Sequence, residues 1–222
     1  VEADSVCLGH GLIPAIEATR LAGADHHYDE TLGGWVPTID QCGRTTVKYL
    51  YACGDNAGIL GVQAAPYRGE LSAIAAVEDL TGSTSETINH HNKALKSLGE
   101  EAAFGIAATA LTIPKNGLIE NIGKNVEVCR CEGITREEIE IELIKGSVSP
   151  NSIKSGTRCG MGPCGGRFCS ESLAMITESI TNQSREEIGL PTARPPLRPV
   201  SMDEISDELD YDELPIPGVS PL

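Results

Sequence analysis

Four cysteines between residues 129 and 169 form the pattern in this sequence most able to do chemistry. Cys129 and Cys131 make a Cys-x-Cys pair, and 32 residues later Cys164 and Cys169 make a Cys-x-x-x-x-Cys pair. Thiolates are soft ligands that select zinc, copper(I) or iron–sulfur clusters. Structural zinc sites usually space their cysteines two to four residues apart, whereas neighbours at i and i+2 of an extended segment share one face. The spacing therefore favours an iron–sulfur cluster.

Glycines and arginines surround these cysteines and suit a cluster. A residue without a side chain lets backbone N–H groups approach the sulfurs, and guanidinium groups can offset the charge of four thiolates. The residues concerned are Gly160, Gly162, Gly165, Gly166, Arg130, Arg158 and Arg167. Cys169 begins an apolar stripe at helical spacing, so its sulfur is expected near a helix N-terminus, where the dipole favours an anionic ligand.

A fifth cysteine leaves the choice of ligands open at this point. Cys159 lies five residues before Cys164, as Cys164 lies five residues before Cys169, so spacing alone permits a swap. A zinc site and plain core cysteines are the alternatives to a cluster. The other three cysteines lack the spacing of a redox pair and are interpreted as buried or structural thiols: Cys7, Cys42 and Cys53. The histidine pairs at 26–27 and 90–91 are expected at the surface, and no acid–base pair stands out.

Strands, turns and helices must position these residues. Strands are predicted over residues 4–8 and 49–52, and Gly54 and Asp55 end the second one. A helix is predicted over residues 63–80. Strand, glycine-rich turn and helix, in that order, are how α/β folds build a cradle for a phosphate or a cofactor.

Capping residues predict where further helices begin. Ser83 with Glu86 forms the reciprocal capping pattern and opens a helix over residues 83–112. Two more helices are expected between the cysteine pairs, and their capping residues are Thr135, Glu138 and Ser149.

Composition divides the chain into four parts within an α/β fold class. The 24 glycines and the low aromatic content of 4% suit close backbone approaches better than an aromatic-rich sandwich. After a glycine-rich first part come a helical linker, a cysteine-rich part, and a proline-rich, then acidic tail. The predicted boundaries are 1–82, 83–124, 125–183 and 184–222.

Charge and cysteine usage exclude several classes of protein. The net charge of −15 argues against a nucleic-acid partner, which needs clustered lysine and arginine. The longest apolar stretch, residues 102–113, is shorter than the roughly 20 residues that span a bilayer, so no transmembrane segment is expected.

Eight cysteines are too few for a disulfide scaffold, so we expect a reducing, cytoplasmic compartment, with the inner membrane contacted only through partners. The first residue is Val, which leads us to expect a fragment or a processed chain.

Two segments resemble a known iron–sulfur domain. These are Cys-Arg-Cys-Glu-Gly-Ile-Thr-Arg-Glu-Glu-Ile at 129–139 and Ile-Lys-Ser-Gly-Thr-Arg-Cys-Gly-Met-Gly-Pro-Cys-Gly-Gly-Arg-Phe-Cys at 153–169. Together they resemble the bacterioferritin-associated-ferredoxin-like (BFD-like) [2Fe-2S] domain that is fused to flavin dehydrogenases. The resemblance implies a small helical domain. The ligands that it implies are Cys129, Cys131, Cys164 and Cys169, and it leaves Cys159 out.

The first part of the chain resembles flavoproteins of the glutathione-reductase type. Thr-Thr-Val-Lys-Tyr-Leu-Tyr-Ala-Cys-Gly-Asp at 45–55 is similar to their second FAD fingerprint, in which the aspartate, here Asp55, accepts a hydrogen bond from the ribityl chain. Residues 6–14 resemble the segment that returns the chain to the FAD domain. The resemblance implies FAD contacts from Gly11, Gly54, Asp55, Val62, Gln63 and Ala64. It also implies the C-terminal piece of a glutathione-reductase-type FAD-binding fold.

From residue 1 to about 200 the chain is similar to the A-type subunit of opine oxidase and of hydrogen cyanide synthase. The resemblance implies a part of an FAD- and [2Fe-2S]-dependent dehydrogenase acting on an amine or amino acid, such as an opine, a secondary amino acid or glycine. It also implies a hetero-oligomer with an amino-acid-oxidase-like flavoprotein subunit. The first FAD fingerprint, Gly-x-Gly-x-x-Gly, is absent, so FAD is expected to need a part outside this chain. The alternatives are a zinc-stabilised interaction module and a non-catalytic electron-transfer subunit.

Overall fold

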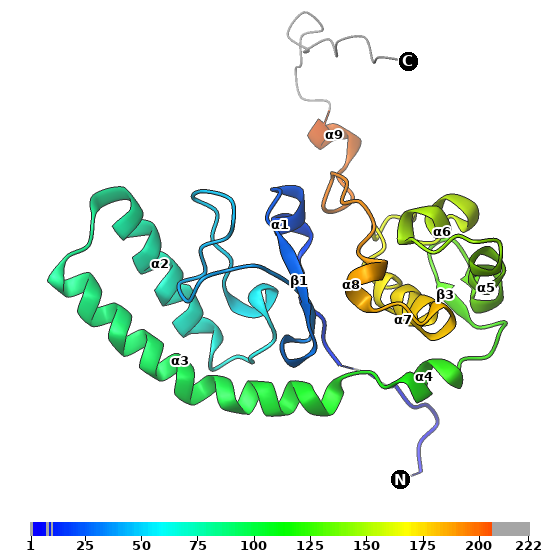
Figure 1. Cartoon of the computed structure of the whole chain (residues 1–222), viewed down its shortest axis with the longest axis horizontal. Helices are drawn as coiled ribbons and strands as arrows, with labels where there is room; N and C mark the ends of the chain where they lie inside the picture. The colour runs from blue at the N-terminus through cyan, green and yellow to red at the C-terminus, as the bar shows by residue number, and fades with distance from the viewer. Residues whose placement is uncertain (1, 8, 10, 206–222) are drawn as a thin grey trace, which may run out of the picture.

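The computed structural model describes residues 2–7, 9 and 11–205 of the chain, and it belongs to the α/β class. In chain order its elements are α1 (Glu17–Leu21), β1 (His26–Asp29), η1 (Glu30–Leu32), β2 (Gly34–Pro37), η2 (Gly54–Ala57), α2 (Ala65–Thr81), α3 (Ser85–Thr112), α4 (Asn116–Glu120), β3 (Glu127–Cys129), β4 (Ile134–Thr135), α5 (Arg136–Ile144), α6 (Pro150–Thr157), α7 (Ser170–Thr181), α8 (Arg185–Ile188) and α9 (Met202–Ile205). Figure 1 shows the α2–α3 hairpin at one end of the molecule and α5, α6 and α7 gathered at the other.

The helical hairpin of α2 and α3 begins and ends at residues suited to those positions. Pro66 lies in the first turn of α2, where its missing N–H is not needed, and Gly82 with φ 86° follows the last turn. Thr84 caps α3: its side chain accepts from the Thr87 N–H, and the Thr87 hydroxyl accepts from the Thr84 N–H. The predicted capping pair of Ser83 with Glu86 is therefore wrong by one residue. Two threonines form the same reciprocal pair of bonds one residue later, to the N–H groups of Thr84 and Thr87.

The long helix α3 is held to the loop before α2 by a close backbone contact. A Cβ added at Gly105 would lie 2.1 Å from the Leu60 carbonyl oxygen, so only glycine allows this approach. One turn later, the Thr109 hydroxyl donates to the Ile59 carbonyl oxygen at 2.9 Å. These contacts fix both the position of α3 along its axis and its rotation.

The first part of the chain contains less strand than its sequence predicts. Residues 4–7 form no strand, and Leu8 lies outside the described residues. Of residues 49–52, Tyr51 alone pairs, in an isolated bridge with Arg44, and Tyr49 has a left-handed φ of 63° that interrupts extended backbone. A strand needs a hydrogen-bonded neighbour along its length. Within the described residues this segment has one such bridge, held by the bonds from the Thr45 N–H to the Leu50 carbonyl and from the Ala52 N–H to the Gly43 carbonyl. The strand predictions were therefore wrong at both places.

A short antiparallel hairpin of β1 and β2 links the two ends of the molecule. The Tyr28 ring packs edge-on against Trp35, its partner in the register, with ring centroids 5.9 Å apart. The guanidinium of Arg185 on α8 lies over the Tyr28 ring, 5.7 Å from its centroid. Arg185 is buried and pairs with Glu171 and Glu178 of α7, each at 2.7 Å. Arg185 thus connects the β1–β2 hairpin to α7 of the cysteine-rich part.

The cysteine-rich part is a small helical unit whose helices begin where their caps predict. Thr135 and Glu138 form a capping box at the start of α5, and Ser149 caps α6 together with Ser152. The fully buried isoleucines Ile139, Ile153 and Ile176 come from α5, α6 and α7 and form one core with three cysteines. The cysteines therefore lie inside the packed core of this unit.

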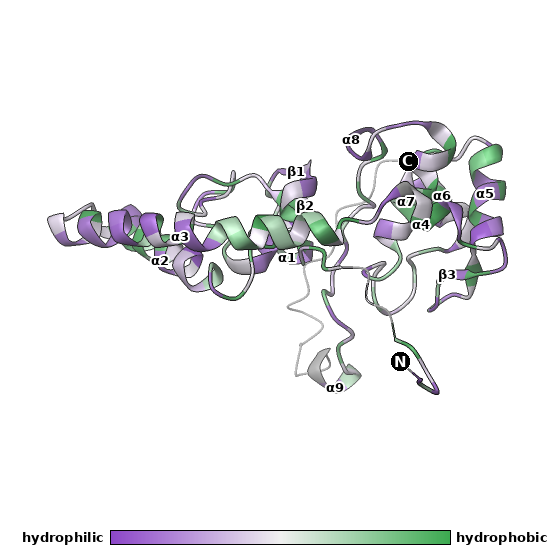
Figure 2. Ribbon diagram, turned by 90° about the horizontal axis from the view of Figure 1, so that it is seen from below, coloured by the Kyte–Doolittle hydropathy of each residue, from purple (hydrophilic) through white to green (hydrophobic). Residues whose placement is uncertain are grey.

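The stretch Ser85–Glu120, which runs through α3 and α4, is long and apolar enough to cross a membrane by length and composition alone. Only 18% of its most apolar window is buried. Figure 2 shows how hydropathy changes along α3: hydrophilic and hydrophobic residues alternate near its start, and hydrophobic residues dominate toward its end. The expectation that no stretch reaches spanning length was wrong, because the helix adds turns before residue 102. Helices of soluble proteins pass the same test, so no membrane location follows.

Candidate metal centre and flavin contacts

Three buried cysteine thiols meet at the centre of the cysteine-rich part. The Sγ atoms of Cys129, Cys159 and Cys169 all lie within 4.8 Å of one another, and each residue is at most 2% exposed. Cys129 ends β3, Cys159 follows α6, and Cys169 is the N-cap residue of α7. Three separate elements therefore deliver one thiol each to a single point.

Cys131 and Cys164 form a second, more accessible pair beside this trio. The thiols of Cys131 and Cys164 are close enough to affect each other's pKa, and Cys131 is exposed while Cys164 is half-buried. The Cys164 N–H lowers the pKa of Cys131, but the thiol contact, desolvation and the charge of Cys164 outweigh it, so the pKa is raised. All four predicted ligands are thus close together, with Cys159 as a fifth member.

Backbone N–H groups gather around the sulfur of Cys164. Burial raises the pKa of this thiol, yet hydrogen bonds from the N–H groups of Phe168, Gly166 and Arg167, with the Cys131 thiol, lower it overall. The Gly160 N–H likewise donates to Cys129 Sγ at 3.5 Å. N–H groups aimed at sulfur stabilise the thiolate form that binds metal.

Glycine is required where the backbone passes Cys131. A Cβ added at Gly162 would lie 2.1 Å from the Cys131 Cβ and 3.2 Å from its Sγ. Gly166 has a φ of 83°, and a Cβ there would lie 2.9 Å from the Ser170 hydroxyl oxygen. The predicted reason for these glycines, approach of backbone N–H groups to the sulfurs, is observed at Gly160 and Gly166. At Gly162 the close approach is to the Cys131 Cβ.

Two of the three arginines named near the cysteines, Arg158 and Arg167, form ion pairs with carboxylates. Arg158 pairs with Glu132 at 2.8 Å, and Arg167 pairs with Glu17 of α1 at 2.6 Å. The Arg167 guanidinium also donates to the Leu197 carbonyl oxygen at 3.0 Å. These two side chains therefore organise the loops around the cysteines, and Arg167 joins the cysteine loop to the first part of the chain.

The donor set fits a [2Fe-2S] cluster. In the described part of the chain three thiols meet in an apolar core, and two more lie beside them nearer to solvent. Soft thiolates from loops rich in N–H groups are what such clusters require. The sequence left Cys159 outside the ligand set, and its equal spacing of five residues was the one signal that could have placed it with the others.

The turn at Gly54 and Asp55 is shaped by Arg68 of α2. Gly54 opens η2 with a φ of 68°, and the Arg68 guanidinium donates to the Gly54 carbonyl at 3.2 Å and the Gly58 carbonyl at 2.9 Å. Burial lowers the pKa of Arg68, with the nearby Asp55 carboxylate opposing it. The Asp55 side chain is exposed, while the neighbouring Asn56 Oδ1 is buried without a hydrogen-bond partner among the described residues.

The N-terminus of α2 is open to a ligand. Val62 and Gln63 are exposed in the preceding turn, Ala64 is the buried N-cap residue, and no side chain caps the helix. An uncapped helix start beside an exposed carboxylate and an orphaned amide oxygen fits a group with hydroxyls and phosphates. Gly11 has a φ of 112° and lies against α3, where a Cβ would be 2.7 Å from the Thr112 carbonyl oxygen.

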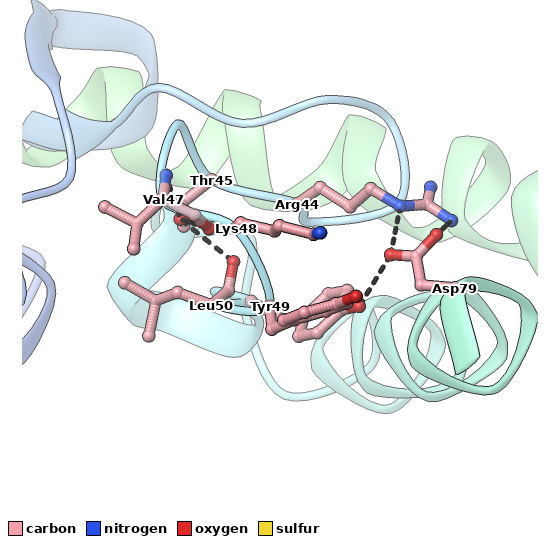
Figure 3. A pocket seen from close by; sticks show the side chains of 8 residues that line it. Arg44, Thr45, Val47, Lys48, Tyr49, Leu50 and Asp79 are labelled. Atoms are coloured by element: carbon pink, nitrogen blue, oxygen red, sulfur yellow. Dashed lines mark hydrogen bonds and ion pairs between the residues drawn. The ribbon is translucent and has the colours of Figure 1, made fainter.

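A pocket of about 420 Å³ adjoins this segment at residues 44–51 (Figure 3). Asp79 of α2 closes one side, because its carboxylate accepts two bonds from Arg44 at 2.8 Å and one from the Tyr51 hydroxyl at 2.6 Å. The Arg44 hydrogen bonds, followed by that of Tyr51, lower the pKa of Asp79 to about 2. None of the predicted FAD-contacting residues lines this pocket, so we interpret it as a structural feature of the loop.

The remaining cysteines and histidines differ in part from their predicted surroundings. Cys42 is buried, as expected, and its Sγ lies 3.3 Å from the His91 Nε2, so His91 is not a simple surface residue. Cys7 and Cys53 are exposed, which overturns their interpretation as buried thiols, because the loops that carry them lie at the surface. His26 is half-buried against the Thr19 hydroxyl, and burial lowers its pKa.

Comparisons with known proteins agree with this geometry. Residues 127–179 match the family model of the BFD-like [2Fe-2S] binding domain. The A-type subunit of opine oxidase from Agrobacterium tumefaciens (strain Ach5) is 33% identical over 211 residues, which cover 93% of this chain and 41% of that protein. Hydrogen cyanide synthase subunit HcnB of Pseudomonas protegens is 26% identical over 205 residues, or 90% of this chain and 42% of that protein.

A solved structure shows the same fold. The L-proline dehydrogenase of P. horikoshii superposes with a TM-score of 0.68 at 24% identity, over 86% of this chain and 37% of that one. The chain spans about two fifths of the length of the curated relatives it matches. By their names these proteins include a dehydrogenase and part of an oxidase, which are oxidoreductases. Residues 127–179, which hold the three meeting thiols and the pair beside them, are thus a BFD-like [2Fe-2S] binding domain, in a homologue of HcnB and of the A-type subunit of opine oxidase.

Proposed function

We propose that this chain is the electron-relay part of an FAD- and [2Fe-2S]-dependent dehydrogenase that oxidises an amine or amino acid. The substrate classes that its relatives favour are an opine, a secondary amino acid and glycine. The observation that carries the proposal is the convergence of thiols within a BFD-like domain that contacts the flavoprotein-like part through Arg167 and Glu17. The chemistry supplied by the bound groups is two-electron oxidation at the flavin and one-electron transfer at the cluster.

The ligands proposed for the cluster are Cys129, Cys131, Cys164 and Cys169. Cys129 and Cys169 supply two buried sulfurs, and Cys131 and Cys164 supply two on the solvent side. The core around Ile153 and Ile176 excludes water from the first pair. N–H groups around Cys164 favour its charged thiolate form. This thiol lies on the solvent side of the centre, where water also stabilises the charge.

The residues proposed to contact FAD are Gly11, Gly54, Asp55, Val62, Gln63 and Ala64. Support comes from the exposed Asp55 carboxylate, which can accept a hydrogen bond from a hydroxyl, and from the uncapped α2 N-terminus, whose dipole favours negative charge. Arg68 holds the carbonyls of Gly54 and Gly58 and so keeps the turn in shape. The domain boundaries at residues 82, 124 and 183 remain proposals of the same kind.

The partner proposed for the chain is an amino-acid-oxidase-like flavoprotein subunit, in a hetero-oligomer located in the cytoplasm. Support comes from the names of the relatives, which describe both the opine oxidase chain and HcnB as subunits. In this proposal the oxidation of the substrate takes place on the partner. Co-purification of the natural complex, followed by flavin analysis of each component, tests this division.

The first experiment is anaerobic expression of the chain, with visible absorption, EPR after dithionite reduction, and iron and zinc assays on one sample. About two irons per chain and a reduced S = 1/2 signal would support the proposal. A colourless protein with stoichiometric zinc and no iron would overturn it in favour of a zinc-stabilised interaction module. Iron without any flavin in the natural complex would favour a plain electron-transfer subunit.

A separate experiment addresses the flavin contacts in the natural complex. Asp55→Ala should lower the flavin bound per complex, because a hydrogen-bond acceptor next to the α2 N-terminus is lost. Asp25→Ala, at an exposed aspartate in the loop before β1, is the matched control and should leave flavin content unchanged. Equal flavin content in both variants would contradict the assignment of Asp55.

A further inference from the structure

The trio of buried thiols contains one more sulfur than the proposed ligand set uses. Cys129 and Cys169 are proposed ligands, while Cys159 is not, yet its Sγ lies within 4.8 Å of both. Cys159 is 1% exposed, so it faces the same apolar core and not solvent. A residue matched to the metal centre in distance, burial and chemistry is therefore left without a role.

The local backbone holds Cys159 in this place. Arg158 has a left-handed φ of 69° and ends α6, and Gly160 has a φ of 84° directly after Cys159. The Met161 N–H donates to the Arg158 carbonyl at 2.9 Å and closes the turn. The Cys159 N–H donates to the Thr157 hydroxyl at 3.0 Å. A non-glycine residue such as Arg158 stays in the left-handed region only where its surroundings hold it there. The fold therefore fixes the position of the Cys159 thiol that follows.

We propose that Cys159 is a reserve ligand of the metal centre, able to take the place of Cys169 or Cys129. This inference rests on the proposed function, since it needs the cluster to bind. When Cys159 enters, its S–H bond breaks, the proton passes to solvent, and the thiolate forms the bond to iron that the missing cysteine would have made. No oxidation state changes, so the exchange needs no further reactant.

Cys159 can replace only the two buried ligands, Cys129 and Cys169. The Sγ atoms of Cys159 and Cys129 both lie within 4.8 Å of the Cys169 Sγ, whereas Cys131 and Cys164 do not belong to this trio. The backbone at Gly162 packs directly on the Cys131 Cβ and occupies the space that another side chain would need. Loss of a buried ligand is therefore compensated, and loss of Cys131 is not.

The test compares alanine variants of the full chain, all expressed anaerobically. The variants are Cys159→Ala, Cys169→Ala, Cys129→Ala, Cys131→Ala and the double change Cys159→Ala with Cys169→Ala. Iron per chain and the EPR spectrum of the reduced protein are measured, with circular dichroism as a check of folding. Wild type and Cys159→Ala should share iron content and spectrum. Cys169→Ala and Cys129→Ala should retain more than half of the iron with shifted g values, while Cys131→Ala and the double variant should lose it.

Each contrary outcome has a distinct meaning. If folded Cys169→Ala and Cys129→Ala lose iron as completely as the double variant, Cys159 is a bystander and the inference fails. If Cys159→Ala alone loses iron as Cys131→Ala does, Cys159 is a resident ligand, which also overturns a reserve role. If Cys169→Ala unfolds, Cys169→Ser, which keeps the volume, decides by the same comparison. If wild type binds no iron, the proposed function falls together with this inference, whereas the first two outcomes leave the function intact.

Discussion

The guanidinium of Arg167 donates to the Glu17 carboxylate at 2.6 Å and so joins the loop between Cys164 and Cys169 to α1, 150 residues earlier in the chain. Both side chains are about one quarter exposed, so the ion pair is partly shielded from water. The same guanidinium also binds the Leu197 carbonyl. One side chain thus orients the cysteine loop, the first helix and the proline-rich segment together.

Replacing Arg167 by Gln should loosen this junction and lower the free energy of unfolding by about 1 kcal/mol, the upper range for a partly exposed pair. Chemical denaturation followed by circular dichroism measures the change. Lys96→Gln, at an exposed ion pair with Glu100 whose atoms are 3.9 Å apart, is the control and should change stability by only a few tenths of that amount. Equal effects of both substitutions would show that the Arg167 contact does not stabilise the junction.

Gly162→Ala should strongly reduce iron content. The new Cβ would lie 2.1 Å from the Cys131 Cβ, so the loop or Cys131 must move, and a ligand on the open side of the centre is displaced. Gly99→Ala, in α3 with nothing within 4 Å of the added Cβ, should leave iron content at the wild-type level. Iron assay and visible absorption of both variants check the prediction. Full iron loading of Gly162→Ala would mean that the backbone approach to Cys131 is not required.

Asp79 should make stability depend on pH in the acid range. Its pKa is lowered from 3.8 to about 2, first by the Arg44 hydrogen bonds and then by Tyr51. A carboxyl whose folded pKa is depressed stabilises the fold above its unfolded pKa, and this contribution is lost as pH falls through the folded value. The contribution should therefore be complete above about pH 5 and disappear as the pH falls toward 2.

Asp79→Asn provides the measurement. Urea denaturation of wild type and variant should show wild type more stable at neutral pH, with the difference shrinking as the pH is lowered below the normal aspartate pKa. Because the Arg44 and Asp79 side chains are both partly exposed, added salt should also reduce the difference. A difference in stability that stays constant from neutral to acid pH would contradict a titrating ion pair.

Thr84→Ala should destabilise the start of α3 by about 1 kcal/mol, because the Thr87 N–H loses its acceptor. Ser83→Ala is the matched control one residue earlier and should have almost no effect. Thermal unfolding of both variants distinguishes them. A larger effect at Ser83 than at Thr84 would restore the capping position that the sequence pattern predicted.

Local chemistry explains which features the sequence could predict. The caps at Thr135 and Ser149 depend on residues three positions apart, and the structure confirms both. The α/β class and the cysteine-rich domain follow from composition and spacing in the same way. By contrast, the equal spacing of Cys159, Cys164 and Cys169 permits Cys159 to join the centre but cannot decide it, because its approach to Cys129 depends on how the turn after α6 lies against the end of β3.

The wrong strand predictions have a similar cause. Residues 49–52 are apolar and aromatic enough for a strand, but a strand forms only where a neighbouring segment offers hydrogen bonds. Among the described residues, the segment around Arg44 does so over one bridge only: the Thr45 N–H donates to the Leu50 carbonyl, and the Ala52 N–H donates to the Gly43 carbonyl. The exposed Cys53 and the Cys42–His91 contact were missed for the same reason, since burial depends on packing between distant segments.

The contacts of α3 limit how its length can vary among related proteins. Gly105 and Thr109 hold one face of the helix to the loop before α2, and Ala94 is buried further toward its start. One inserted residue between Ala94 and Gly105 would rotate one contact face relative to the other by about 100°, so the helix could keep only one of them. Insertions and deletions in relatives should therefore cluster at the two ends of α3, and any that occur between these contacts should come in whole turns.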